Sequence, residues 1–304
     1  MDEIIKSLRL SSRRLVREFD MIKGNFRSTG YTHSECHTLI ELEQYGVLTL
    51  KELADLLNVD KSIISRTVNK LTKNGLVKQV KRNRDNREKP ITLTAKGFKE
   101  VGRLNKEANS QVADALELLK EEERLTVLEG IQSYSRALNK IRRQSGYNIR
   151  RIQRGDNKFI ERIIIDVMTE FGAVGEGYSI KDEEVSNMYD AYDNDRSVYY
   201  VIEREGEIVG GSGIGPLEKG DKDVCELKKM YFIPDLRGIG LGEKLLRLCL
   251  ESAKEMGYKK CYLETLGRMP QARGLYEKFG FKPLKSPLGC TGHFNCEAWY
   301  IKEL

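Results

Sequence analysis

The chain has 304 residues, of which 39% are hydrophobic and 32% are charged, and these proportions are typical of a globular protein in water. No apolar run approaches the ~20 residues of a membrane-spanning helix, and the first residues lack the apolar core of a signal peptide. Six cysteines in so long a chain do not form a dense disulfide framework. We therefore expect a cytoplasmic protein with two domains, since one domain usually has ~100–200 residues.

The charge is unevenly distributed along the chain. Residues 1–146 contain 28 Lys and Arg against 20 Asp and Glu, whereas the remaining residues contain 24 against 26. The first part therefore carries a charge of +8 and the second a charge of −2. A basic domain is a candidate for binding a polyanion such as DNA, although charge alone is weak evidence.

Residues 50–73 have the pattern of two short helices joined by a tight turn. Leucines repeat at helical spacing over residues 50–57, and Asp60 is suited to cap a second helix at Lys61–Lys73, which Gly75 closes. This helix-turn-helix pattern predicts that the second helix enters the major groove of DNA. Its outward polar side chains are expected to meet bases and phosphates: Lys61, Ser62, Ser65, Arg66 and Asn69.

A strongly basic segment follows, between two short stretches with strand character at residues 76–80 and 91–94. From Lys78 to Lys89 it holds six cations against two acids. This pattern predicts a β-hairpin, or wing, whose cations contact phosphates or the minor groove, with Asp85 holding the basic side chains in place. The cations expected at the wing are Arg82, Arg84 and Arg87.

The D-x-R signature at Asp85–Arg87, followed by "LTAKG" at residues 93–97, resembles the MarR family of winged-helix regulators when it is combined with the helix-turn-helix. The resemblance covers about residues 1–143. It implies a mainly α winged helix with a two-stranded wing, which binds double-stranded DNA as a homodimer built from terminal helices. Apolar positions that fit such an interface are Ile4, Leu8, Leu15, Phe19, Ile22, Val112, Leu116, Leu119, Leu125, Leu128, Leu138 and Ile141.

Beyond a polar joint at residues 142–148 the pattern becomes mixed. We expect strands at residues 148–153, 197–203, 207–214, 224–233, 259–266 and 297–304, and helices at 156–171, 237–257 and 270–280. The sequence therefore predicts an α+β domain at residues 146–304, after a DNA-binding and dimerisation domain at residues 1–145.

Three glycines, Gly238, Gly240 and Gly242, lie between a predicted strand and a predicted helix. Bare backbone N–H groups at the start of a helix form an anion site, for which a diphosphate is a natural ligand. The spacing does not fit a dinucleotide-binding G-x-G-x-x-G, and no G-K-[ST] of a P-loop is present. The alternative is that the glycines serve only the close packing of strand and helix.

The R-x-x-G-x-G pattern from Arg237 to Gly242, with "ARGLYEKFGF" at residues 272–281, resembles the GNAT superfamily of acyl-CoA N-acyltransferases over about residues 148–304. The resemblance implies a central, mostly antiparallel sheet and acetyl-CoA as acyl donor. It assigns the coenzyme A pyrophosphate to the loop and the pantetheine to the preceding strand. The residues so assigned are Met230, Phe232, Arg237, Gly238, Ile239, Gly240, Leu241 and Gly242.

Two catalytic groups follow from the same resemblance. Tyr276 stands where a phenol protonates the departing thiolate, although a tyrosine that only packs is the alternative. Glu226 stands where related histone acetyltransferases carry a catalytic glutamate, and burial in a sheet would raise its pKa toward neutrality. Glu226 could instead anchor the substrate or lie at the surface, and Glu264 is the second choice for the base. The family often has Asn where this chain has Met269, which puts one pantetheine contact in doubt.

The last hairpin of the family borders the acceptor pocket, so the resemblance places His293, Glu297 and Trp299 there, with Glu264. Two groups have metal-like spacing: His33, Cys36 and His37, and Cys290, His293 and Cys296. Each lacks an evident fourth ligand, so we expect no metal.

These features together predict a bifunctional regulator that binds operator DNA as a dimer and acetylates the amine of a small molecule. In the alternative, the second domain is a non-catalytic sensor of acyl-CoA or of an amine. A third hypothesis, an acetyltransferase that modifies proteins, has no sequence feature for or against it. The fold alone does not decide among them.

Overall fold

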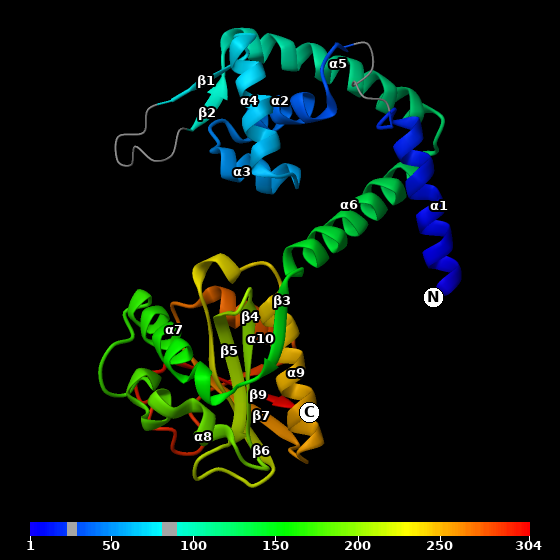
Figure 1. The fold of residues 1–304 in the computed structure, drawn as a ribbon. Helices are drawn as coiled ribbons and strands as arrows, with labels where there is room; N and C mark the ends of the chain where they lie inside the picture. Colours follow the sequence, from blue (N-terminus) through cyan, green and yellow to red (C-terminus); the bar gives the residue numbers. More distant parts are fainter. Residues whose placement is uncertain (23–28, 81–89) are drawn as a thin grey trace. The chain divides into compact units, whose positions relative to one another are not determined.

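The computed structural model describes residues 1–22, 29–80 and 90–304, which form two compact units, residues 1–128 and 129–304 (Figure 1). The boundary lies inside helix α6 (Glu121–Gln144), because the end of this helix contacts the second unit. The domain boundary predicted from the sequence, between residues 145 and 146, falls just after this helix. No described helix is long and apolar enough to cross a membrane.

The first unit is mostly helical. Its elements are α1 (Asp2–Glu18), α2 (His33–Tyr45), α3 (Leu50–Leu57), α4 (Lys61–Lys73), β1 (Val77–Gln79), β2 (Ile91–Leu93) and α5 (Ala95–Glu117), followed by the start of α6. Helices α2 and α3 each begin with a capping box, in which a Thr hydroxyl and a Glu carboxylate satisfy each other's backbone amides. Asp60 is the N-cap residue of α4 as predicted, but its side chain makes no capping hydrogen bond.

The helix-turn-helix and the base of the wing have the predicted form. Ile64, Val68 and Leu71 of α4 are buried in one apolar core with residues of α2 and α3. Strands β1 and β2 pair antiparallel, with Val77 opposite Leu93. The wing residues Arg82, Arg84, Asp85 and Arg87 lie outside the described residues.

Helices α1 and α6 bury no side chain among the described residues, so their apolar residues are exposed to solvent. On α1 they include Ile4, Leu8 and Leu15, and on α6 they include Leu128, Leu138 and Ile141. Exposed apolar faces of this kind are typical of protein–protein interfaces.

The second unit is built on a seven-stranded sheet in the order β3-β4-β5-β6-β7-β9-β8. All neighbouring strands are antiparallel except β6 and β7, which are parallel and are connected by helix α9. The strands are β3 (Tyr147–Arg151), β4 (Val198–Arg204), β5 (Glu207–Pro216), β6 (Val224–Phe232), β7 (Lys260–Thr265), β8 (Lys282–Leu284) and β9 (Ala298–Glu303). The helices are α7 (Asn157–Glu170), α8 (Met188–Tyr192), α9 (Leu241–Glu255) and α10 (Pro270–Lys278).

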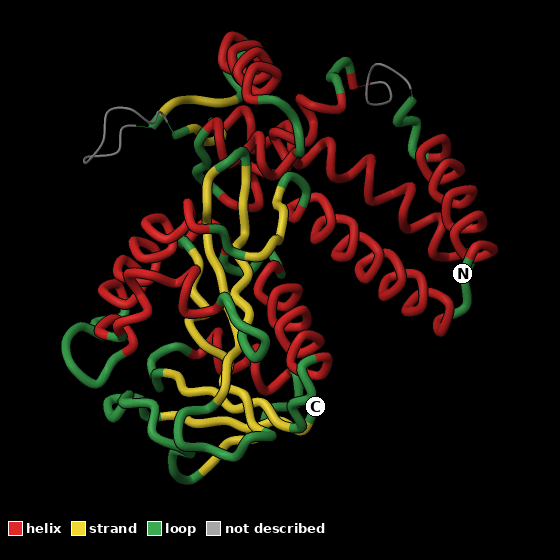
Figure 2. Tube along the Cα trace, turned by 60° about the horizontal axis from the view of Figure 1, so that its bottom comes forward, coloured by secondary structure: helices red, strands yellow, loops and turns green. Residues whose placement is uncertain are grey.

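Helices cover both faces of this sheet, as Figures 1 and 2 show for α7 and α9. Successive side chains of a strand point to opposite faces of a sheet, and the side chains of β4 are apolar on both faces. Val198, Tyr200 and Ile202 pack in one core with α9, whereas Tyr199 and Val201 pack in the other core with α7. The predicted α+β fold with a mostly antiparallel sheet is confirmed.

The sheet opens between the two parallel strands. Their pairing ends where Glu226 stands opposite Tyr262, although β6 continues to Phe232. Just beyond that point two residues of β6 face one residue of β5, and Lys229 adopts a left-handed φ of 53°. Such a bulge bends its strand away from a neighbour. The backbone of β6 beyond Glu226 is therefore not paired with β7.

Candidate functional site

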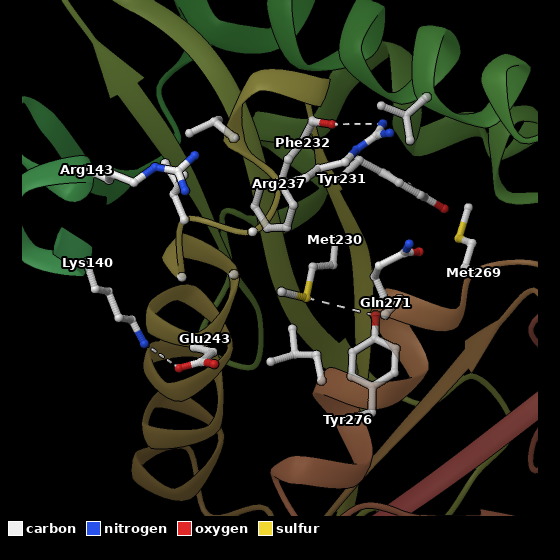
Figure 3. Close-up of a pocket in the computed structure, with 18 of the residues that line it drawn as sticks. Lys140, Arg143, Met230, Tyr231, Phe232, Arg237, Glu243, Met269, Gln271 and Tyr276 are labelled. Atoms are coloured by element: carbon white, nitrogen blue, oxygen red, sulfur yellow. Dashed lines mark hydrogen bonds and ion pairs between the residues drawn. The ribbon is translucent and has the colours of Figure 1, made fainter. Parts of the chain in front are cut away.

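A cavity of about 940 Å³ lies within the second unit, next to the opening between β6 and β7 (Figure 3). Its wall includes the end of β6, the glycine loop, the start of α10 and one face of α6. Among its lining residues are all the predicted cofactor-binding residues except Leu241: Met230, Phe232, Arg237, Gly238, Ile239, Gly240 and Gly242.

The glycine loop presents backbone to this cavity. Gly238 and Gly240 have left-handed φ values of 74° and 84°, which glycine adopts without steric cost. The side chains of Ile239 and Leu241 are buried in the core, so these two residues have only their backbone available to a ligand. The amides at the start of α9 precede the first helical hydrogen bond, from Lys244 N–H to the Gly240 carbonyl. They are suited to bind an anion such as a diphosphate.

Arg237 is held in place by helix α7. Its guanidinium donates to both carboxylate oxygens of Glu170, at 2.6 and 2.5 Å, and lies 5.3 Å from the ring centre of Phe171. Because both partners line the large cavity, this ion pair forms part of its wall.

A second cavity of about 70 Å³ adjoins the first. The two cavities share part of their lining, namely Met230, Tyr231, Met269, Ala272 and Tyr276. The smaller one is lined on its other side by charged groups, among them Glu226, Lys228, Lys229, Glu264 and His293. A large cavity with an anion-binding loop and a small polar cavity therefore meet at one group of side chains.

Tyr276 lies at this junction. Its side chain is buried, and its hydroxyl points toward the sulfur of Met230 at 3.9 Å. Burial raises the pKa of the phenol, so that Tyr276 keeps its proton at neutral pH. The group can therefore donate a proton to an atom that is placed between the two cavities.

Glu226 lies on the side of the small cavity. It is only 4% exposed, and burial raises the pKa of its carboxyl to about 7. A carboxylate with this pKa can take up a proton near neutral pH, which is what a general base requires.

An ion-pair cluster stands next to Glu226. The Lys229 ammonium pairs with the carboxylate of Asp182 and, at 2.9 Å, with that of Glu184. His293 Nε2 contacts Asp182 Oδ2 at 2.9 Å, and its Nδ1 lies 3.5 Å from Glu264 Oε2. The left-handed bulge described above orients the buried Lys229 side chain into this cluster.

The cluster keeps His293 charged. Burial lowers the pKa of this imidazole, but the hydrogen bonds with Asp182 and Glu264 outweigh burial and raise the pKa to about 9. His293 is therefore a cation at neutral pH and is not available as a base there. Glu264 is engaged as well, because it accepts a hydrogen bond of 2.6 Å from the hydroxyl of Tyr262.

Not all predicted acceptor residues reach the small cavity. Glu264 and His293 line it, whereas Glu297 and Trp299 line neither cavity. Trp299 packs instead against a separate apolar cluster that contains Leu217. Trp299 is paired with Glu264 across β7 and β9, so the two side chains lie on the same face of the sheet, but Trp299 packs into its apolar cluster outside the cavity.

Within the described residues no group of three His, Cys, Asp or Glu side chains could hold a metal ion. Cys36 is buried in the core of the first unit, and Cys290 is exposed.

The predicted recognition residues lie on one helix of the first unit. On α4 the side chains of Lys61, Ser62, Arg66 and Asn69 are exposed and that of Ser65 is half-buried. The opposite face of α4 is in the core, so these residues are presented to solvent together.

Sequence reasoning missed two parts of the site. One is the set of ion-pair partners Asp182, Glu184 and Lys229, which no sequence feature connects with the predicted residues Glu226 and His293 and which meet them only in the fold. The other is the face of α6 along the large cavity, formed by Ser135, Arg136, Asn139, Lys140 and Arg143. The cations of this face, Arg136, Lys140 and Arg143, are spaced by four and three residues. This spacing places them on one face of a helix and is visible in the sequence.

Two family models match the chain in the order that the sequence predicts. The MarR family matches residues 31–89, and the acetyltransferase (GNAT) family matches residues 161–281. The chain is 45% identical over 157 residues to the uncharacterized N-acetyltransferase YjgM of Escherichia coli (strain K12). This alignment covers 51% of this chain and 94% of YjgM. The chain therefore belongs to the GNAT acetyltransferase family and carries a MarR-family domain before its acetyltransferase domain.

Two further proteins show similarity to parts of the chain. The uncharacterized HTH-type transcriptional regulator YfiV of Bacillus subtilis (strain 168) is 28% identical over 35% of this chain and 66% of its own length. The PaiA N-acetyltransferase of Thermoplasma acidophilum, solved in complex with coenzyme A, aligns with 52% of this chain and 99% of its own, at 16% identity and a TM-score of 0.42.

Proposed function

We propose that the chain transfers the acetyl group of acetyl-CoA to the amine of a small molecule, and that it does so as part of a dimeric DNA-binding regulator in the cytoplasm. The main observation in support of acetyl transfer is that the two cavities meet at Met230 and Tyr276. On one side of Met230 and Tyr276 lie the glycine loop and a large cavity, and on the other side lies a buried carboxyl with a pKa near 7.

Each residue at the junction then has a distinct task. The loop amides and Arg237 bind the phosphates of the donor, and the edge of β6 that is not paired with β7 orients its pantetheine arm. The thioester supplies the activated acetyl group. Glu226 takes the proton of the incoming amine, and Tyr276 delivers a proton to the departing sulfur.

A direct transfer fits these groups better than an acetylated enzyme. Cys296 lines the small cavity, but burial raises its pKa to about 12, so it is a thiol at neutral pH and a poor nucleophile. The acceptor amine attacks the thioester itself in this mechanism. The small volume of this cavity favours a compact amine over a protein surface.

The test is to mix the protein with acetyl-CoA and a panel of small amines and to follow the release of free thiol between pH 5 and 9. For its substrate the protein should show kcat/KM rising about tenfold per pH unit up to a plateau above pH 7, because Glu226 must lose its proton.

The variant Glu226→Gln should lose this inflection and most of the rate, since an amide cannot accept the proton. An unchanged profile in the variant would remove Glu226 from the base role. If acetyl-CoA binds but no amine in a broad panel releases thiol, the chain is the sensor and not the enzyme.

DNA binding is proposed from a separate observation, the polar, exposed face of α4 within a MarR-family domain. The exposed apolar faces of α1 and α6 support a homodimer, which would bind two half-sites about one helical turn apart. Duplexes selected from a random library by the protein should contain a near-palindrome.

The variant Arg66→Ala should then alter the base preference at one position in each half-site, at a cost of ~1–3 kcal/mol, if Arg66 contacts a base edge. A selection that yields no common sequence would contradict specific recognition by this helix.

A further inference from the structure

The end of helix α6 lies against the glycine loop. Gln144 Nε2 donates a hydrogen bond of 3.1 Å to the Ile239 carbonyl, and Lys140 Nζ forms an ion pair of 2.6 Å with Glu243 in the first turn of α9. A side-chain carbon on Gly240 would collide with Lys140 Cε. Gly240 therefore allows both a left-handed turn and the close passage of the Lys140 side chain.

One face of this helix borders the large cavity. Ser135, Arg136, Asn139, Lys140 and Arg143 all line it, and these positions lie on one side of a helix with 3.6 residues per turn. Figure 3 shows Lys140 and Arg143 entering from α6 on the side of the cavity that faces away from Tyr276.

The positive charges on this wall outnumber the carboxylates beside them in the described residues. Arg136, Lys140, Arg143 and Arg237 line the cavity together with only two carboxylates, Glu170 and Glu243. Glu170 is engaged by Arg237, and Glu243 is shared between Lys140 and Lys278. Neighbouring cations that outnumber their carboxylates in a concave site attract a polyanion.

We propose that the last turns of α6, through Arg136, Lys140 and Arg143, form part of the acyl-CoA site and bind its phosphate groups. The inference rests on the proposed function and adds ligands from outside the matched acetyltransferase segment, since residues 161–281 do not include α6. Lys140 stands next to the loop amides, and Arg136 lies one helical turn before it.

The experiment compares three ligands by calorimetry on the full chain: CoA, 3′-dephospho-CoA and S-acetylpantetheine, which has no phosphate. Lys140→Gln should weaken CoA binding about threefold, and the combined substitution of Arg136, Lys140 and Arg143 by Gln about 30-fold, as expected for partly exposed ion pairs. The salt dependence of CoA binding should become shallower in the same order. S-acetylpantetheine should bind the variants as well as it binds the wild type, which also reports that the site is folded.

The matched control is Lys254→Gln, which removes one exposed cation at the other end of α9 and should leave CoA binding unchanged. A larger effect on CoA than on 3′-dephospho-CoA assigns α6 to the 3′-phosphate, and an equal effect assigns it to the diphosphate. Wild-type CoA affinity in the triple variant, or an equal loss for S-acetylpantetheine, would overturn the inference. If the wild type itself binds no CoA, both the proposed function and the role of α6 in phosphate binding are wrong.

Discussion

The two cavities on either side of Tyr276 are built in different ways. The large cavity combines the backbone of the glycine loop with cations of α6 and apolar side chains of β6 and α10. The small one is formed by buried ionisable side chains from four segments of the chain, which balance one another through ion pairs. In the proposed function the large cavity is the donor side, which binds one common ligand, and the small cavity is the acceptor side, where neighbouring charges set protonation states.

The difference has a physical basis. Diphosphate recognition needs N–H groups at a helix start, and these are available to any sequence that places glycine there. A carboxyl reaches a pKa near 7 when it is buried. Charged side chains that are buried beside it are stable only when they form ion pairs or hydrogen bonds. The cluster of Asp182, Lys229 and His293 meets this requirement around Glu226.

The substitution Tyr276→Phe should have the largest effect, because the tyrosine belongs to both cavities. Removal of its acidic proton should lower kcat by ~10²–10⁴-fold and leave the Kd of CoA close to wild type. Steady-state thiol release and calorimetry measure the two quantities. Tyr300→Phe is the control, since this hydroxyl lies nearby but bonds to Arg273 and Glu277. Full turnover in the Tyr276→Phe variant would leave Tyr276 as a packing residue only.

On the donor side, Gly240→Leu should weaken CoA binding about 100-fold or more, because a side chain at a φ of 84° distorts the loop and obstructs the amides. Gly257→Leu is a control for backbone strain: Gly257 has a φ of 83° and follows the other end of α9. Both variants should lose stability in thermal unfolding, but only the first should lose CoA binding. Equal CoA affinity in the two variants would place the diphosphate elsewhere.

On the acceptor side the expected effect is on stability. Because the folded-state pKa of His293 is about 9, against an ordinary value of 6.5, the charged imidazole stabilises the fold below pH 6.5. This contribution, of order 3 kcal/mol at most, should be lost as the pH rises through 9. Denaturant unfolding of wild type and His293→Gln at pH 6 and pH 9.5 measures it. The gap between the two proteins should shrink at the higher pH, and a constant gap would show that His293 is not charged in the fold.

The sequence predicted most of the fold because its helices and strands follow local patterns. The helix-turn-helix, both wing strands and the strands of the large sheet except β8 lie where apolar periodicity, Asp60 and glycines indicate them. Strand β8 has only three residues, two of them exposed, so it leaves no such pattern. The loop Arg237–Gly242 was also recognisable, because its arginine and glycines lie in one contiguous segment of the sequence.

The acceptor side was less predictable for the same reason. Asp182 and His293 are 111 positions apart, and only the fold brings them together. Lys229 gave no sign of being buried, since a lysine in a strand normally reaches solvent. Trp299 was assigned to the acceptor pocket by resemblance, but it packs into a neighbouring apolar cluster on the same face of the sheet as Glu264.

A crystal structure of the full chain with acetyl-CoA would show whether the two cavities meet at the reacting thioester. We expect the diphosphate on the amides of Gly238–Gly242, the pantetheine along β6 in the opening beyond Glu226, and the thioester sulfur within hydrogen-bonding reach of the Tyr276 hydroxyl. The carbonyl carbon should face the cavity that holds Glu226. A thioester bound away from the junction of the two cavities, with its phosphates off the glycine loop, would contradict this expectation.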